Sequence, residues 1–278
     1  MARNVRNKLF GTGDPQLDMA VGMVPGVRTR NAFAINTDID AGVAETLWNV
    51  GGDWVGPTTP QTLTLVSDSA DDDAVTGQGA WEVTVVGLSS LGPGGILISE
   101  KVLLDGITPV QTQNDYAISC FVHVTNHGTT GINAGSITVT ATDDATAQHR
   151  IDPNVGTSQT AVCAVLTGQT MVITGYHGAI RSKTGGNVDF ELLTDRGDHL
   201  DLTADSFTRL HSQTALSSGT SAFVQRFNPY IAIGGPAAIQ IRVTADSNNM
   251  EVVGGFDLVV VDNVEMNRLR KARKLPNT

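Results

Sequence analysis

Cysteine, aromatic side chains and charge are all scarce in this chain of 278 residues. There are two cysteines, 5% aromatic residues and 17% charged residues, against 30 glycines. The shortage of aromatics argues against the aromatic-lined cleft of a carbohydrate-active enzyme, and no tryptophan follows Trp81. The 40% of apolar residues is enough to bury a core, and its richness in Val, Ile, Leu and Ala favours β structure with many turns.

Long apolar runs are missing as well. No segment approaches the roughly 20 apolar residues that span a bilayer, and the N-terminal MARNVRNKLFG has no apolar stretch behind its charges. We therefore expect a soluble protein, synthesised in the cytoplasm, with no membrane partner. Cys120 and Cys163 each lie in an apolar, strand-like run, which predicts buried free thiols, although a disulfide between them stays an alternative.

Motifs of the common catalytic and cofactor sites are also absent. The chain has no G-x-S-x-G nucleophile elbow, no Walker loop and no dinucleotide fingerprint. The histidines lack metal-site spacing, although His123 and His127 can meet at the end of one strand. We predict no cofactor, no metal and no enzymatic activity. A polysaccharide-degrading enzyme stays a minor hypothesis, since paired carboxylates are defined by their separation in space.

Short alternating runs of β-branched residues are the main pattern that is present. Five such runs fall between residues 62 and 142, and seven more between 160 and 262. Neither half alternates strands with helices of about 10 to 15 residues, so a parallel sheet is disfavoured. The predicted fold class is all-β, with two antiparallel β-sandwich or jelly-roll-like domains, an extended N-terminal arm and a short basic C-terminal helix or tail.

A polar, irregular segment at 143–159 separates the two sets of strands and marks the expected domain boundary. We expect an N-terminal arm at 1–40, a first β domain at 41–145, a second β-sandwich at 146–262 and a basic end at 263–278. The basic end predicts a helix, with Asn263 as its N-cap and Pro276 after its end. Because this helix has few apolar residues to bury, we expect it to gain stability by docking.

Basic residues are concentrated at the two ends of the chain. Residues 31–267 hold 8 basic and 26 acidic side chains, a net charge of −18, although the whole chain has −10. An acidic body repels phosphate backbones, so nucleic acid is not an expected partner. The basic ends are interpreted as docking arms for an acidic neighbour, or alternatively as solvated tails. The candidate partner-binding residues are Arg3, Arg6, Lys8, Arg28, Arg30, Arg268, Arg270, Lys271, Arg273 and Lys274.

Two clusters in the first half have both a structural and a functional interpretation. Trp48 and Trp54 flank a Gly-Gly turn and can form a ligand-stacking platform for sugar, but a buried cap over the adjacent sheet is the more frequent outcome. Asp68 and the Asp71, Asp72 and Asp73 run offer oxygen ligands for calcium, but they lack the spacing of an EF-hand loop. We therefore predict a solvated turn there.

Several phrases in a fixed order resemble virion structural proteins of tailed bacteriophages, including phages of marine and freshwater bacteria and cyanophages. They are TLWNVGGDW, PTTPQTLTLVSDSADDDAVTGQGAWEVTVVGL, SEKVLLDGITPVQTQNDY, GINAGSITVTA, SQTAV and DSNNMEVVGGFDLVVVD, and together they cover roughly residues 45–262. The resemblance implies a non-enzymatic β-sandwich component of the particle, present in many copies.

The resemblance and the basic ends together predict a structural role in the virion. We expect a head decoration (cement) protein, or an accessory protein at the tail or head-to-tail junction, that holds neighbouring subunits together. Its expected partners are copies of itself, as a trimer or larger homo-oligomer, and other virion proteins such as the major capsid or tail proteins. The alternative is a receptor- or carbohydrate-binding module of a phage fibre. In that module, either Trp48 and Trp54 or Tyr176 and His177 would contact the sugar.

Overall fold

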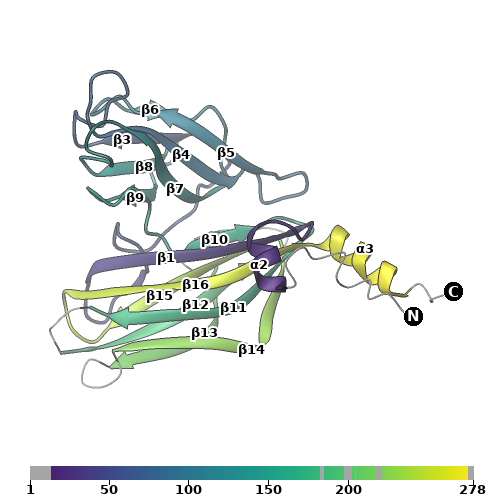
Figure 1. Ribbon diagram of the computed structural model, residues 1–278. Coiled ribbons are helices and arrows are strands. Elements are labelled where there is room, and N and C mark those ends of the chain that lie inside the picture. Colours follow the sequence, from purple (N-terminus) through teal and green to yellow (C-terminus); the bar gives the residue numbers. More distant parts are fainter. Residues whose placement is uncertain (1–13, 182–184, 197–201, 204, 217–220, 275–278) are drawn as a thin grey trace.

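Two antiparallel β-sandwiches, one inserted into the other, make up the protein (Figure 1). The computed structural model describes residues 14–181, 185–196, 202, 203, 205–216 and 221–274. Every pairing between named strands in this part of the chain is antiparallel. The predicted all-β fold class with two sandwich domains is therefore confirmed.

The inserted domain packs a four-stranded sheet, ordered β6-β3-β8-β9, against a three-stranded sheet, β5-β4-β7. Alternate residues of β3 and β8 are buried, as expected for strands with one face on a core. The inward side chains form one apolar cluster that includes Leu63, Val83, Tyr116 and Val139. The strands are β3 (Leu63–Ser67), β4 (Ala80–Leu88), β5 (Leu97–Leu103), β6 (Val110–Gln111), β7 (Ile118–His127), β8 (Ile137–Ala141) and β9 (Ala147–Ile151).

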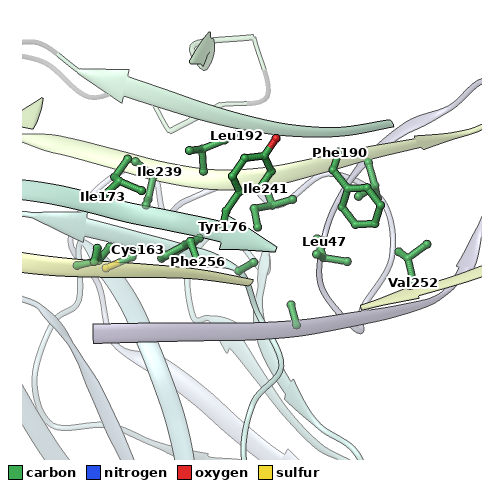
Figure 2. Packing of buried hydrophobic residues seen from close by; sticks show 14 of the residues in the cluster. Leu47, Cys163, Ile173, Tyr176, Phe190, Leu192, Ile239, Ile241, Val252 and Phe256 are labelled. Atoms are coloured by element: carbon green, nitrogen blue, oxygen red, sulfur yellow. The ribbon is translucent and has the colours of Figure 1, made fainter. Parts of the chain in front are cut away.

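The main domain packs the sheet β1-β16-β11-β14 against a second sheet, β10-β15-β12-β13, with β2 also paired to β15. Its core interleaves side chains of both sheets, among them Ile173, Tyr176, Phe190 and Ile241 (Figure 2). The strands are β1 (Val27–Ile39), β2 (Ala44–Thr46), β10 (Val162–Val165), β11 (Gln169–Ile180), β12 (Asn187–Arg196), β13 (Thr208–Leu216), β14 (Ala222–Gly234), β15 (Ala237–Ala245) and β16 (Met250–Asp262).

The domain boundaries differ from those expected from the sequence. The predicted arm at 1–40 is wrong from residue 27 onwards, because β1 pairs with β16 along most of its length. β2, expected in the first domain, joins the main domain through β15. β9 lies in the segment expected to be a linker and completes the sheet of the inserted domain beside β8. The main domain is therefore discontinuous in sequence. No local sequence pattern predicts that its first two strands pair with strands that follow the inserted domain.

Two helices flank the strands of the main domain. The short helix α2 (Pro15–Ala20) begins at Asp14, whose Oδ1 accepts hydrogen bonds from the backbone N–H groups of Gln16 and Leu17. The helix α3 (Asn263–Lys274) follows β16 directly, as the sequence predicts. Its capping side chain is Asp262 and not Asn263, because Asp262 Oδ1 accepts from the N–H of Val264 at 2.8 Å.

Candidate functional site: the domain interface and the basic helix

An apolar cluster joins the two domains. Leu88, Ile118 and Cys120 of the inserted domain pack against Val162 and Ala164 of β10. Inter-domain contacts of this apolar kind resist relative motion of the domains, unlike polar contacts that open easily. The other buried members of the cluster are Trp48, Trp54, Leu166, Leu193, Leu202, Phe207 and Ala238.

The two candidate stacking tryptophans belong to this buried cluster. Trp48 is 3% exposed and Trp54 0%, so neither ring can receive a sugar. The indole N–H of Trp48 donates to the carbonyl oxygen of Gly52 at 2.9 Å, across the Gly-Gly turn. Tyr176 is also buried, and its hydroxyl hydrogen-bonds to His211 at 2.9 Å. These positions remove the main support for a carbohydrate-binding platform on either pair.

Polar side chains tie the domains together around the apolar cluster. His149 of β9 lies between the carbonyl oxygen of Ser119, 3.1 Å from Nε2, and the hydroxyl of Thr160, 3.2 Å from Nδ1. The amide of Asn49 donates to the carbonyl of Arg150 and to the carboxylate of Asp152. Burial lowers the pKa of His149 to about 4, so the imidazole is neutral at neutral pH.

The histidines do not gather into a catalytic or metal-binding group. His123 stacks on Phe121 with ring centroids 4.9 Å apart, and partial burial lowers its pKa. His127 lies exposed at the end of the same strand, where it contacts the carbonyl of Gly128. Within the described ranges, no three His, Cys, Asp or Glu side chains are placed to hold a metal ion together. His199 lies outside the described residues.

The aspartate run forms a buried hydrogen-bond network around Asp72, and not the solvated turn that the sequence predicted. Asp72 is fully buried, and its carboxylate accepts hydrogen bonds from the backbone N–H groups of Ala80, Ala134 and Gly135 and from the hydroxyl of Ser67. These four bonds occupy the acceptor positions that a cation would need. Asp72 thereby connects the loop between β3 and β4 to the loop before β8.

The basic residues near the N-terminus divide into two groups. Arg28 and Arg30 lie on β1, within the sheet of the main domain, and not on a free arm. Arg28 is exposed, whereas the guanidinium of Arg30 turns inward and donates to Cys163 Sγ at 3.2 Å. Arg30 is therefore not available to bind a partner. Arg3, Arg6 and Lys8 lie outside the described residues.

The C-terminal helix α3 projects from the end of the main domain and away from both sandwiches (Figure 1). Its start is anchored: the backbone N–H of Asn263 donates to the carbonyl oxygen of Gly168, and the hydroxyl of Thr170 donates to Asn263 Oδ1 at 2.7 Å. Gly26 lets the chain pass close by, since a Cβ there would lie 2.7 Å from Glu265 Cβ. Val264, in the first turn, is 74% exposed.

Charge along α3 is almost entirely positive. Arg268 forms an ion pair with Glu265 at 3.3 Å, and Lys271 is exposed one turn further on. Arg270, Arg273 and Lys274 belong to the same helix, and their side chains lie outside the described part. A helix of 12 residues that stands off the body is marginal in water by itself.

A groove crosses the outer face of the sheet β1-β16-β11-β14, with a volume of about 890 Å³. Met19 of α2, Val172 of β11 and Val259 of β16 are among the apolar residues that line it. Tyr230 lines the groove with 60% of its surface exposed. Sequence reasoning missed this feature, because its residues come from five separate segments of the chain.

Comparisons with known proteins assign no family to the chain. No protein-family model matches it, and no curated protein matches it in sequence. Among solved structures, that of the Gx strain of infectious bursal disease virus is similar to 85% of this chain and 72% of its own, with 11% identity and a TM-score of 0.26. The structure of the VP2 subviral particle of the same virus is similar to 84% of this chain and 72% of its own, with 9% identity and a TM-score of 0.24. Similarities this weak assign neither a fold family nor a function to the chain.

None of the helices in the described part of the chain is long and apolar enough to span a bilayer.

Proposed function

We propose that this protein is a non-enzymatic structural component of a tailed-phage virion, which holds neighbouring subunits together as a head decoration protein or as an accessory protein of the tail or head-to-tail junction. It is synthesised in the host cytoplasm and functions in the virion. The sequence phrases that resemble phage virion proteins support this role. Two sandwiches joined through a shared apolar cluster also support a structural role.

The observation that carries the proposal is the basic helix that stands off an acidic body. Residues 31–267 carry a net charge of −18, and residues 268–274 carry five positive charges and no acid. Opposite charges on two parts of one chain attract between copies, and repeated contacts between many copies gain avidity. Helix α3 of one copy then docks on the acidic body of the next, as a trimer or larger homo-oligomer, or on another virion protein.

Oligomeric state in solution tests the first part of the proposal. Light scattering after size exclusion is expected to show oligomers of the full chain that dissociate as salt is raised, because salt screens exposed charges. Neutralising Arg268→Gln and Lys271→Gln together is expected to weaken self-association at least tenfold. The matched control, Lys101→Gln with Arg181→Gln, removes the same charge from exposed positions on the body and should leave association unchanged.

Particle binding tests the second part. Purified protein is expected to bind phage heads or tails that lack it, and a cryo-EM map of the whole particle is expected to show its sandwiches at a repeated site. A chain that stays monomeric at all concentrations and binds neither heads nor tails would overturn the proposal. Equal loss of association in the helix variant and in the body control would contradict the role of α3.

A further inference from the structure

Cys120 and Cys163 come from different domains and meet at the domain interface. Cys120 lies on β7 of the inserted domain and Cys163 on β10 of the main domain. Both are free and buried, with 9% and 1% of their surfaces exposed. Both side chains line the same cavity between the domains, together with Arg30. Only the packing of one domain on the other creates this pair.

Arg30 places a positive charge against the two sulfur atoms. Arg30 lies on the edge strand β1, and its Nη1 donates a hydrogen bond to Cys163 Sγ at 3.2 Å. The neighbouring Cys163 thiol and the positive charge of Arg30 lower the pKa of the Cys120 thiol well below its usual range. The neighbouring Cys120 thiol and burial raise the pKa of Cys163, whose Sγ donates to the carbonyl oxygen of Ala164 at 3.7 Å. The guanidinium beside the two cysteines therefore favours the thiolate form of Cys120.

The pair is buried, but a cavity leads to it. Cys120, Cys163 and Arg30 line a cavity of about 350 Å³ between the domains. Phe33 and Phe121, which are both substantially exposed, line it as well and connect it to the surface. A space of this size admits a small oxidant, since one water occupies only about 30 Å³ of liquid. A thiol beside a stabilising cation, with a second thiol in the same cavity, is the arrangement found in oxidation-sensitive pairs.

We propose that Cys120 and Cys163 form a redox pair that hydrogen peroxide, entering through this cavity, converts to a disulfide between the two domains. The Cys120 thiolate attacks one peroxide oxygen, the O–O bond breaks, and the released hydroxide takes up a proton to leave as water. The resulting sulfenic acid is attacked by the Cys163 sulfur, which forms the S–S bond and breaks the S–O bond. That hydroxide leaves as water with the Cys163 proton. Two thiols are oxidised and one peroxide is reduced to two waters.

The disulfide changes what Arg30 contacts and how the domains separate. It closes the chain from residue 120 to residue 163 into a covalent loop, which restricts the unfolded state. Oxidation removes the thiolate form of Cys120 that the charge of Arg30 favours in the reduced protein. The oxidised protein therefore resists unfolding more strongly than the reduced protein.

Peptide mapping of the full chain after peroxide treatment tests the proposal directly. The expected product is one intramolecular Cys120–Cys163 crosslink, with the loss of both free thiols and of two hydrogen masses. The melting temperature is expected to rise by roughly 5–10 °C and to return when a reductant is added. Cys120→Ala with Cys163→Ala is expected to show no peroxide-dependent shift. Formation of sulfinic acid at either cysteine, or of crosslinks only between chains, would overturn the proposal.

Arg30→Gln tests the guanidinium separately. Loss of the charge is expected to slow crosslink formation roughly three- to tenfold at neutral pH, because less thiolate is present. The matched control is Arg28→Gln, an exposed position two residues away on the same strand, which should keep the original rate. Equal rates in the Arg30 variant and the original protein would contradict the role of Arg30. A failure of self-association in the assays of virion function leaves this result unaffected.

Discussion

His149 shows at the scale of one residue how burial controls charge. Its Nε2 faces a carbonyl oxygen, which can only accept, so Nε2 carries the proton and Nδ1 accepts from the hydroxyl of Thr160. Protonating the ring would place a second N–H against that hydroxyl and a charge in a buried site. The sequence indicated no role for this histidine, because its partners lie 11 and 30 residues away.

Stability is expected to fall with acid through His149. Its pKa is about 4 in the folded protein and about 6.5 in the unfolded chain, so between these values the unfolded chain binds the extra proton. The contribution is fully present above about pH 6.5 and is lost as the pH falls to 4, by about 3 kcal/mol in total. Urea unfolding at several pH values measures it. His149→Gln should reduce the change in the free energy of unfolding between pH 6.5 and pH 4. An unchanged pH dependence in this variant would contradict the role of His149.

Trp54 is expected to stabilise the protein by packing alone. Trp54→Ala empties a fully buried position and should lower the free energy of unfolding by about 3–5 kcal/mol. Its indole N–H has no hydrogen-bond partner among the described residues, so Trp54→Phe should lower that free energy by less than about 1.5 kcal/mol. Urea unfolding checks both. Glycan binding that is lost in a fully folded Trp54→Phe variant would instead support a sugar site.

The loop between β3 and β4 is an element organised by one carboxylate. Four aspartates in six positions suggested solvent or calcium, but composition does not reveal which of them turns inward. Asp72 satisfies donors from its own loop and from residues about 60 positions further on, and this long-range pairing is what buries it. The strands on either side could be predicted from their alternation, whereas the role of the loop depends on contacts beyond it.

Asp72 and its neighbour Asp71 provide a matched comparison. Asp72→Asn replaces one acceptor oxygen by a donor facing buried N–H groups, and should lower the free energy of unfolding by about 3 kcal/mol or more. Asp71→Asn makes the same chemical change at an exposed side chain and should stay within about 0.5 kcal/mol. Chemical denaturation measures both. Similar effects of the two substitutions would show that the hydrogen bonds of Asp72 do not stabilise the fold.

The whole molecule is expected to unfold as one unit in spite of its two cores. The cluster around Trp48 and Leu88 is shared by both domains, so opening the interface exposes apolar surface on each. Differential scanning calorimetry should therefore give one transition for the original protein. Leu88→Asp places a charge in the interface and should split the unfolding into two transitions. Two transitions in the original protein would contradict a rigid interface.

Leu63→Asp is the matched comparison, because Leu63 is equally buried but lies in the core of the inserted domain alone. This change is expected to unfold the inserted domain and leave the transition of the main domain. A different pattern of transitions in the two variants separates damage to the interface from damage to one core.

The sequence by itself determined the all-β class, the antiparallel pairing, most strands and the basic helix after β16. These features follow from period-2 alternation, turn residues and a cap, all of which act over a few neighbouring positions. Only the tertiary structure decided that β1 and β2 belong to the main domain, that Trp48 and Trp54 are buried, and that Arg30, Cys120 and Cys163 line one cavity. Each of these depends on pairing between distant segments, which no local pattern of side chains encodes.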